Sequence, residues 1–231
     1  PSGEVFGRTI DELRIKATGA IAQTRRERAR AFRPIETEFI QGVAERGELF
    51  REQESAWRVG PLELQVRREH AQCRWLFNRE VIIEWSRVTS LADLERSRAK
   101  SLENLKKAAL PDLVLHEAFW DSYQECVRLR QGRKANPDLV PLLDFYRQLR
   151  LTLVRRDLAQ RPEKKLSYVD FPKWTFLYNL DLYRSLTSTL LRETRLALQT
   201  GSQQETEKFG MVTNGLDARQ DYKVVCYVLQ G

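Results

Sequence analysis

The sequence predicts a mostly α protein, a multi-helix bundle-like domain of about six or seven helices with a C-terminal β-hairpin-like appendage. The 231 residues include only 11 Gly and 8 Pro, which favours long uninterrupted segments. Apolar residues recur at helical spacings through most of the first 200 residues, and the composition changes after residue 201. We therefore expect a helical domain at 1–201 and a linker with a short β-hairpin tail at 202–231.

The first third of the chain predicts three helices. Thr9 and Glu12 form a capping-box pattern, and the helix that they start should end before Pro34, because proline disfavours helix in the residue before it. A second helix is expected at 35–59. Past the break at Gly60-Pro61, a third is expected at 61–89, where apolar side chains on more than one side suit a central helix.

Two further helices have clear start signals. Ser90 and Asp93 are a plausible N-cap pair for a helix at 91–109, whose largely charged sequence suits a surface position. Pro111 can occupy the start of the next helix, and Gly132 is its natural C-terminal stop.

The strongest start signal is Asn136 followed by Pro137, which predicts a helix that ends at Pro162. Residues 151–154 resemble a strand, but the capped, periodic context favours helix. A long aromatic-rich helix is expected at 172–200, where about 29 residues would span roughly 43 Å.

The C-terminal segment has a different sequence pattern from the helical part. A polar linker at 202–208 precedes two β-like runs at 209–213 and 222–229, with the turn-type pair Asn214-Gly215 opening the connection. An isolated hairpin is marginal in water. We therefore expect it to pack on the helices or to add to a sheet edge in another chain.

The charge distribution points to acidic or polyanionic partners. The net charge is +7, with 39 basic and 32 acidic residues, and arginine dominates the clusters at 25–33 and 128–165. Guanidinium groups make forked contacts with phosphate or carboxylate. A solvated face with internal ion pairs is the alternative. The predicted polyanion or acidic-partner contacts are Arg25, Arg26, Arg28, Arg30, Arg130, Arg133, Lys134, Arg150, Arg155, Arg156, Lys164 and Lys165.

Aromatic residues supply a second set of candidates. Exposed Trp and Tyr beside Arg are typical of protein interfaces, whereas core packing is the alternative interpretation. The predicted partner-interface residues are Trp174, Tyr178, Tyr183, Tyr222 and Tyr227.

The sequence contains no recognisable catalytic motif, and we expect no catalytic, cofactor-binding or metal-binding residues. His70 and Cys73 would share a helix face, but a zinc site needs about four ligands. Asp138 with Glu163 and Lys165 loosely matches the string of a metal-dependent nuclease, whose chemistry requires both acids at the ends of adjacent strands. Asp138 instead lies at a predicted helix start.

These observations favour a non-enzymatic structural or adaptor subunit of a larger assembly that contacts other protein subunits through basic and aromatic helical faces. The alternative is a nucleic-acid-binding protein that binds RNA or DNA through 128–165, and a metal-dependent nuclease is a remote third. Three separate cysteines indicate reduced thiols in an intracellular compartment, an organelle such as the mitochondrion or otherwise the cytoplasm. No stretch approaches the ~20 apolar residues of a transmembrane segment.

Overall fold

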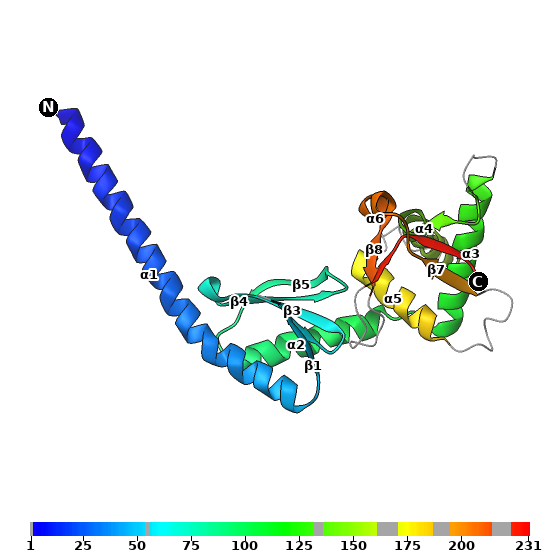
Figure 1. Ribbon diagram of the computed structural model, residues 1–231, viewed down its shortest axis with the longest axis horizontal. Coiled ribbons are helices and arrows are strands. Elements are labelled where there is room, and N and C mark those ends of the chain that lie inside the picture. The colour runs from blue at the N-terminus through cyan, green and yellow to red at the C-terminus, as the bar shows by residue number, and fades with distance from the viewer. Residues whose placement is uncertain (1, 54–55, 132–135, 161–170, 187–194, 214–222) are drawn as a thin grey trace. The chain divides into compact units, whose positions relative to one another are not determined.

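The computed structural model describes residues 2–53, 56–131, 136–160, 171–186, 195–213 and 223–231. The chain forms two compact units: unit 1 comprises 1–76 and 81–101, and unit 2 comprises 77–80 and 102–231. Most of the structure is helical, as predicted, but its sheets are more extensive than a single hairpin (Figure 1). The domain boundary at residue 201 stays a prediction.

Unit 1 begins with one long helix, α1 (Ser2–Glu45), which continues through Pro34 where the sequence predicted an end. Proline removes only one backbone donor, and Pro34 lies on the exposed side. Phe32 and Phe39 are buried on either side of it, so the packed face is continuous across the proline. Packing on both sides therefore outweighs the local cost of proline.

An antiparallel sheet follows in the order β1-β2-β3-β4-β5, with a 3₁₀ turn, η1 (Arg68–His70), between its third and fourth strands. The helix predicted at 35–59 is therefore correct only as far as Glu45, and the helix predicted at 61–89 is wrong. Apolar residues there alternate, since Leu62, Leu64 and Val66 are all buried, and two-residue alternation is the period of a strand. The strands are β1 (Leu49–Gln53), β2 (Ala56–Val59), β3 (Leu62–Arg67), β4 (Gln72–Phe77) and β5 (Glu80–Arg87).

Tight turns connect these strands. Gly47 and Gly60 have φ angles of 70° and 59°, in the left-handed region that glycine adopts without strain. Asn78 and Arg79 also have positive φ, which makes the turn between β4 and β5 a two-residue hairpin turn. The break at Gly60 that seemed to separate two helices is the turn of a hairpin.

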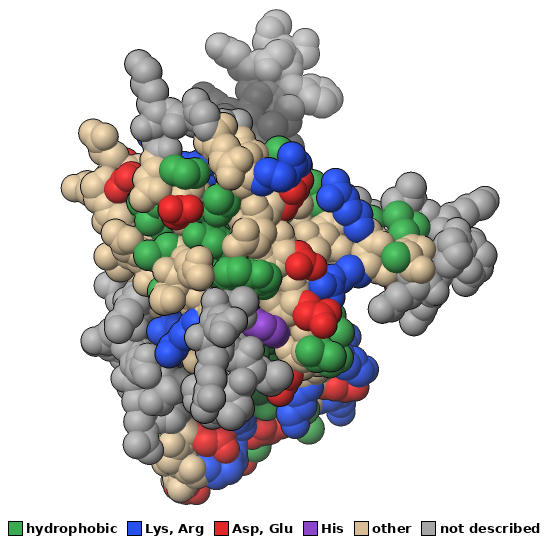
Figure 2. Space-filling model, turned by 90° about the vertical axis from the view of Figure 1, so that its right-hand side faces the viewer, with side chains coloured by type: hydrophobic (Ala, Val, Ile, Leu, Met, Phe, Trp, Pro, Cys, Tyr) green, Lys and Arg blue, Asp and Glu red, His purple; other side chains and the backbone are tan. Residues whose placement is uncertain are grey.

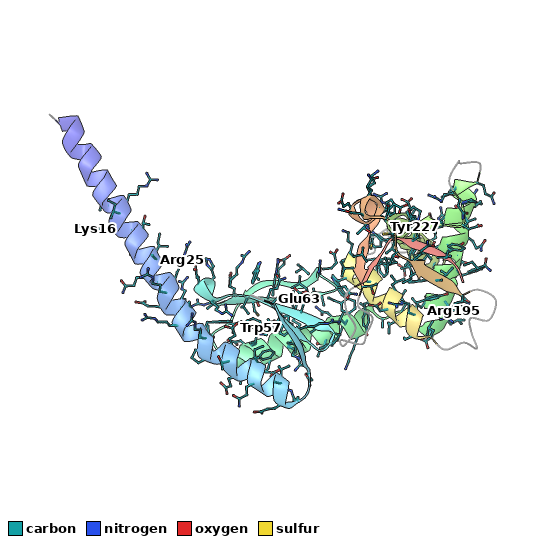
Figure 3. The ribbon with its side chains drawn as sticks, viewed as in Figure 1. Lys16, Arg25, Trp57, Glu63, Arg195 and Tyr227 are labelled. Carbon is teal, nitrogen blue, oxygen red and sulfur yellow. The ribbon has the colours of Figure 1, made fainter. Side chains whose placement is uncertain are left out.

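Two helices cover one face of this sheet. The Phe39 ring of α1 meets the Trp75 ring edge-on at 6.1 Å, and Cys73 lies within hydrogen-bonding reach of Ser97 in α2 (Leu91–Ala108). Trp75 and Cys73 are two residues apart on β4, so both helices contact the same face. Glu63 and Trp57, labelled in Figure 3, lie on opposite faces, because Trp57 pairs with Leu64, the residue next to Glu63 on β3.

The helix predicted at 91–109 is confirmed as α2. The Asp93 backbone N–H donates to Ser90 Oγ at 3.2 Å, and the Asp93 carboxylate accepts from the N–H and hydroxyl of Thr89. These bonds lower the pKa of Asp93 to about 2, chiefly through the Thr89 hydroxyl. The capping signal in the sequence is therefore used as expected.

Unit 2 is built on α3 (Asp112–Arg130), α4 (Leu142–Gln160) and α5 (Lys173–Ser185). Their core is aromatic: the Phe119 ring stacks on Tyr183 at 4.9 Å and lies edge-on to Phe145 at 5.3 Å, with Phe176 beside both. The helix predicted after Pro111 is confirmed, and residues 151–154 are helical. Gly132, the expected C-terminal stop of the helix after Pro111, lies outside the described residues.

Two of the predicted helices in unit 2 are shorter than expected. The Asn136 side chain accepts from the Asp138 N–H within a turn, and α4 starts only after β6 (Val140–Pro141). Val140 pairs with Val228, and that sheet pairing fixes the later start. The single helix predicted at 172–200 is also wrong, because α5 ends at Ser185 and β7 (Leu196–Gln199) is a strand.

The C-terminal segment is more ordered than a linker and a hairpin. Residues predicted as a polar linker form α6 (Gln203–Phe209), which starts with a full capping box between Ser202 and Glu205. The expected hairpin pairing is present between β8 (Met211–Thr213) and β9 (Lys223–Val225), while Asn214-Gly215 is not described. β10 (Tyr227–Gln230) lies between β6 and β7, so this tail pairs within its own chain.

Within the described ranges, no helix is both long and apolar enough to cross a membrane.

Candidate functional site

The N-terminal part of α1 exposes every side chain from residue 13 to residue 28. Leu13, Ile15 and Ile21 are 61%, 72% and 54% exposed, which is unusual for large apolar residues. Leu13 and Ile21 fall with Ala17 and Ala20 on one helical stripe, whereas Ile15 lies off it. This apolar stripe has no cover in the described part of unit 1.

Five arginines follow along the same helix and form the α1 arginine cluster: Arg25, Arg26, Arg28, Arg30 and Arg33. All five side chains are exposed, and none has an ion pair among the residues that the structure describes. Glu27, the acid within the cluster, instead accepts a hydrogen bond from Gln23 at 3.0 Å. Figure 3 labels Arg25, and Lys16 further along the same exposed stretch.

The sheet face of unit 1 opposite to α1 and α2 carries a second basic feature, which we name the Trp85 platform: Gln65, Arg67, Arg74 and Trp85. The guanidinium carbons of Arg67 and Arg74 lie 4.0 Å and 4.6 Å from the centroid of the Trp85 ring. Gln65 accepts from Arg74 Nε at 2.8 Å. The sequence did not predict this group, because its members are neighbours only when 61–89 forms a sheet.

Four arginines of the basic region of unit 2 form ion pairs with acids of its own helices: Arg128, Arg130, Arg147 and Arg156. Arg156 on α4 donates to Glu117 at 2.8 Å and to Asp121 at 2.6 Å on α3. Arg128 makes a two-pronged contact with Glu125 and lowers the pKa of that carboxyl, and Asp144 lies 3.4 Å from Arg147 and 4.0 Å from Arg130. On the face drawn in Figure 2, positive and negative side chains are interspersed rather than segregated.

The remaining basic candidates divide by position. Arg155 on α4 is exposed, and the Arg150 guanidinium lies 5.7 Å from the centroid of the Tyr146 ring. Four predicted contacts lie outside the described residues: Arg133, Lys134, Lys164 and Lys165.

The structure corrects part of the predicted aromatic interface. Tyr183 is 3% exposed and packs in the core of unit 2, where its hydroxyl accepts from the Leu196 N–H. Tyr227 is 8% exposed; burial, and then its hydrogen bond to Glu205, raise its pKa to about 12. Both rings therefore belong to the core.

Two of the predicted interface residues are less deeply buried. Trp174 is half-buried. Tyr178 is also half-buried and meets Phe77 edge-on at 5.6 Å. Tyr222 is not described. Surface contact to a partner stays a prediction for these residues.

A buried polar cluster in unit 2 joins the β4–β5 turn to α5 and β8. The Asp181 carboxylate accepts from Asn78 at 3.0 Å and from Thr213 at 2.6 Å, and Arg184 lies 3.5 Å away. Burial raises the pKa of Asp181 in spite of these donors. Both carboxylate oxygens have protein partners, so the cluster acts as a structural clamp.

Among the residues that the structure describes, no catalytic or metal-binding group suggested by the sequence comes together. Asp138 is exposed, and Glu163 and Lys165 lie outside the described residues, so the nuclease hypothesis stays a prediction. His70 is exposed in η1 while Cys73 is buried in β4, hence the shared helix face expected for them is absent. Among the residues searched, no group of three or more His, Cys, Asp or Glu side chains suits a metal ion.

Comparisons with protein-family models, with curated proteins and with solved structures found no match for this chain. Its function is therefore inferred from burial, charge and side-chain geometry within each unit.

Proposed function

We propose that this protein is a non-enzymatic structural or adaptor subunit of a larger assembly, and that the exposed stretch of α1 binds a neighbouring protein subunit. One observation carries the proposal: 16 consecutive residues, from Leu13 to Arg28, are all exposed on a helix that also presents large apolar side chains.

A helical stretch without tertiary packing is only weakly stable by itself. Most helical stability in proteins comes from packing of an apolar face rather than from intrinsic helix propensity. The packed part of α1 starts near Phe32, so the stretch before it lacks such support within unit 1. Covering Leu13 and Ile21 would contribute about 1.5–3 kcal/mol for each side chain if fully buried.

The stripe also indicates what kind of partner fits. Ala17 and Ala20 lie beside Leu13 and Ile21, so an apolar surface can approach the helix closely between the two larger residues. A parallel pairing with a second copy would place two α1 arginine clusters side by side, and like charges repel. The proposed partner is therefore a different subunit with an apolar groove.

Hydrogen exchange tests this docking directly. In the purified chain, the amides of 13–28 should exchange quickly, because few tertiary contacts hold the helix closed. In the native assembly the same amides should be protected. Strong protection in the isolated monomer, independent of concentration, would remove the need for a partner, and protection that rises with concentration would indicate self-association instead.

Substitutions identify the stripe itself. Leu13→Ser with Ile21→Ser should release the chain from its assembly while unit 1 remains folded. Leu113→Ser with Leu151→Ser is the matched control, because these leucines are 58% and 52% exposed in unit 2. The proposal fails if the α1 variant assembles as well as the control.

A further inference from the structure

The Trp85 platform lies on the face of the sheet opposite to α1 and α2. Arg74 alternates with Cys73 and Trp75 on β4, and those two neighbours face the helices. Gln65 is paired with Arg74 on the adjacent strand, so it shares the open face. Arg67 is exposed, while Arg74 and Trp85 are half-buried.

The platform concentrates positive charge without neutralising it. Two guanidinium groups approach one indole ring, and neither has an ion pair with a carboxylate in the described chain. The nearby acid on β3, Glu63, accepts from Gln65 at 2.6 Å. Gln65 occupies Arg74 Nε, which leaves the terminal N–H groups of Arg74 for another acceptor. An anion that contacts both arginines would relieve their mutual repulsion.

The α1 arginine cluster lies in the same unit and approaches the same end of the sheet. Arg25 and Arg26 line a small hollow together with Glu69 of η1. The 3₁₀ turn η1 begins at Arg68, directly after Arg67 of the platform. Arg68 itself forms a two-pronged ion pair with Glu36 of α1, at 2.7 Å and 2.9 Å, and thereby fixes this end of the sheet against the helix.

We propose that unit 1 binds single-stranded nucleic acid, with phosphate groups on the arginines of α1 and of the platform and with bases stacked at Trp85 and its guanidinium planes. Guanidinium forks match phosphate oxygens. Single-strand binders combine a basic track for the backbone with flat side chains on which bases stack. Unit 1 offers both, and this site is separate from the 128–165 region and from the apolar stripe of α1.

The test is binding of a fluorescein-labelled 12-nucleotide single-stranded oligouridylate to the full chain, measured by anisotropy across a salt series. The double variant Arg67→Gln/Arg74→Gln should bind at least about tenfold more weakly at 50 mM salt, and the slope of log affinity against log salt should be shallower by about 1.4. Trp85→Leu should also weaken binding about tenfold, but with an unchanged slope, because it removes stacking and no charge.

The matched control is Arg150→Gln/Arg155→Gln in unit 2. This variant removes the same charge as Arg67→Gln/Arg74→Gln, and Arg150 also lies over an aromatic ring. The variant should bind the oligonucleotide with the affinity of the original chain. Arg25→Gln/Arg26→Gln tests the helix separately, since both side chains are exposed and their loss leaves the packing unchanged. Arg25→Gln/Arg26→Gln should make the slope of log affinity against log salt shallower by about 1.4, as expected for Arg67→Gln/Arg74→Gln.

Several results would overturn the proposal. One is oligonucleotide binding that survives Arg67→Gln/Arg74→Gln or that is lost instead in the unit 2 control. Another is tighter binding of heparin or of phosphatidylserine vesicles than of the oligonucleotide, which would assign the surface to a different polyanion. Leu13→Ser/Ile21→Ser should bind the oligonucleotide normally, so failure of the subunit-docking proposal and failure of this one are distinguishable.

Discussion

The two units use the same residue types in opposite ways. In unit 2 the aromatic rings of Phe119, Phe145 and Tyr183 form a buried core, and Arg156 is paired with carboxylates of the neighbouring helix. In unit 1 Trp85 lies on an open sheet face under two arginines, and the α1 arginine cluster extends from the helix without ion pairs among the described residues.

This difference shows that arginine content is a poor guide to a binding surface. The region 128–165 is as basic as the whole chain by sequence, yet most of its described arginines have acidic partners at 4.0 Å or less. The cluster on α1 contains fewer cations but little to neutralise them. Charge that is left unpaired, rather than charge that is merely present, marks the surface available to a partner.

The largest contrast should come from the aromatic rings. Phe119→Ala should lower the free energy of unfolding of unit 2 by about 3–5 kcal/mol, because the ring is fully buried among three others. Trp85→Ala should cost unit 1 much less, since its ring is half-buried. Denaturant unfolding of both variants measures the difference, and equal losses would mean that Trp85 is a core residue.

Buried and open polar groups provide the next contrast. Thr213→Val should lower the free energy of unfolding by about 1–3 kcal/mol, because it removes the shortest hydrogen bond to the buried Asp181 carboxylate and leaves Asn78 and Arg184 as its remaining donors. Gln65→Ala on the open sheet face should cost less, since water can replace its hydrogen bonds. If calorimetry shows that the two variants are equally destabilised, the expected difference between the buried and the exposed polar group is wrong.

Arginine substitutions test whether the paired arginines of unit 2 contribute more to stability than the α1 arginine cluster. Arg156→Gln should reduce stability by about 0.2–1 kcal/mol at low salt, and added salt should shrink the loss, because an ion pair at the surface is screened. Arg30→Gln should leave stability unchanged, because the structure shows no acidic partner for it among the described residues. Urea unfolding at two salt concentrations distinguishes the two arginines.

The smallest expected effect is local and depends on pH. Hydrogen bonds from Thr89 hold the pKa of Asp93 at about 2, below its value in an unfolded chain. The charged cap therefore stabilises α2 above the unfolded pKa, and its contribution disappears as the pH falls through about 2. Asp93→Asn, which can still cap a helix, should flatten the acid unfolding curve monitored by circular dichroism. An unchanged curve would show that this carboxylate contributes no stability.

Part of the fold could be predicted from local signals. The Ser90–Asp93 cap marks the start of α2, and Pro111 precedes the start of α3, because both signals act within one helical turn. The Ser202–Glu205 capping box is an equally local signal, and it starts α6 in a stretch that the polar composition predicted to be a linker. The Trp85 platform could not be found in this way, since Arg67 and Trp85 are 18 positions apart and adjoin only across a sheet.

The sequence by itself determined the mostly helical character, the capped start of α2 and the positions of both basic clusters, because composition and local hydrogen bonding encode them. Only the tertiary structure decided that 61–89 forms strands, since its apolar spacing approximates both a helical and an alternating period and burial selects between them. The tertiary structure also decided which arginines face carboxylates and which tyrosines are buried. Those outcomes depend on neighbours that are distant along the chain, and a short stretch of sequence does not specify them.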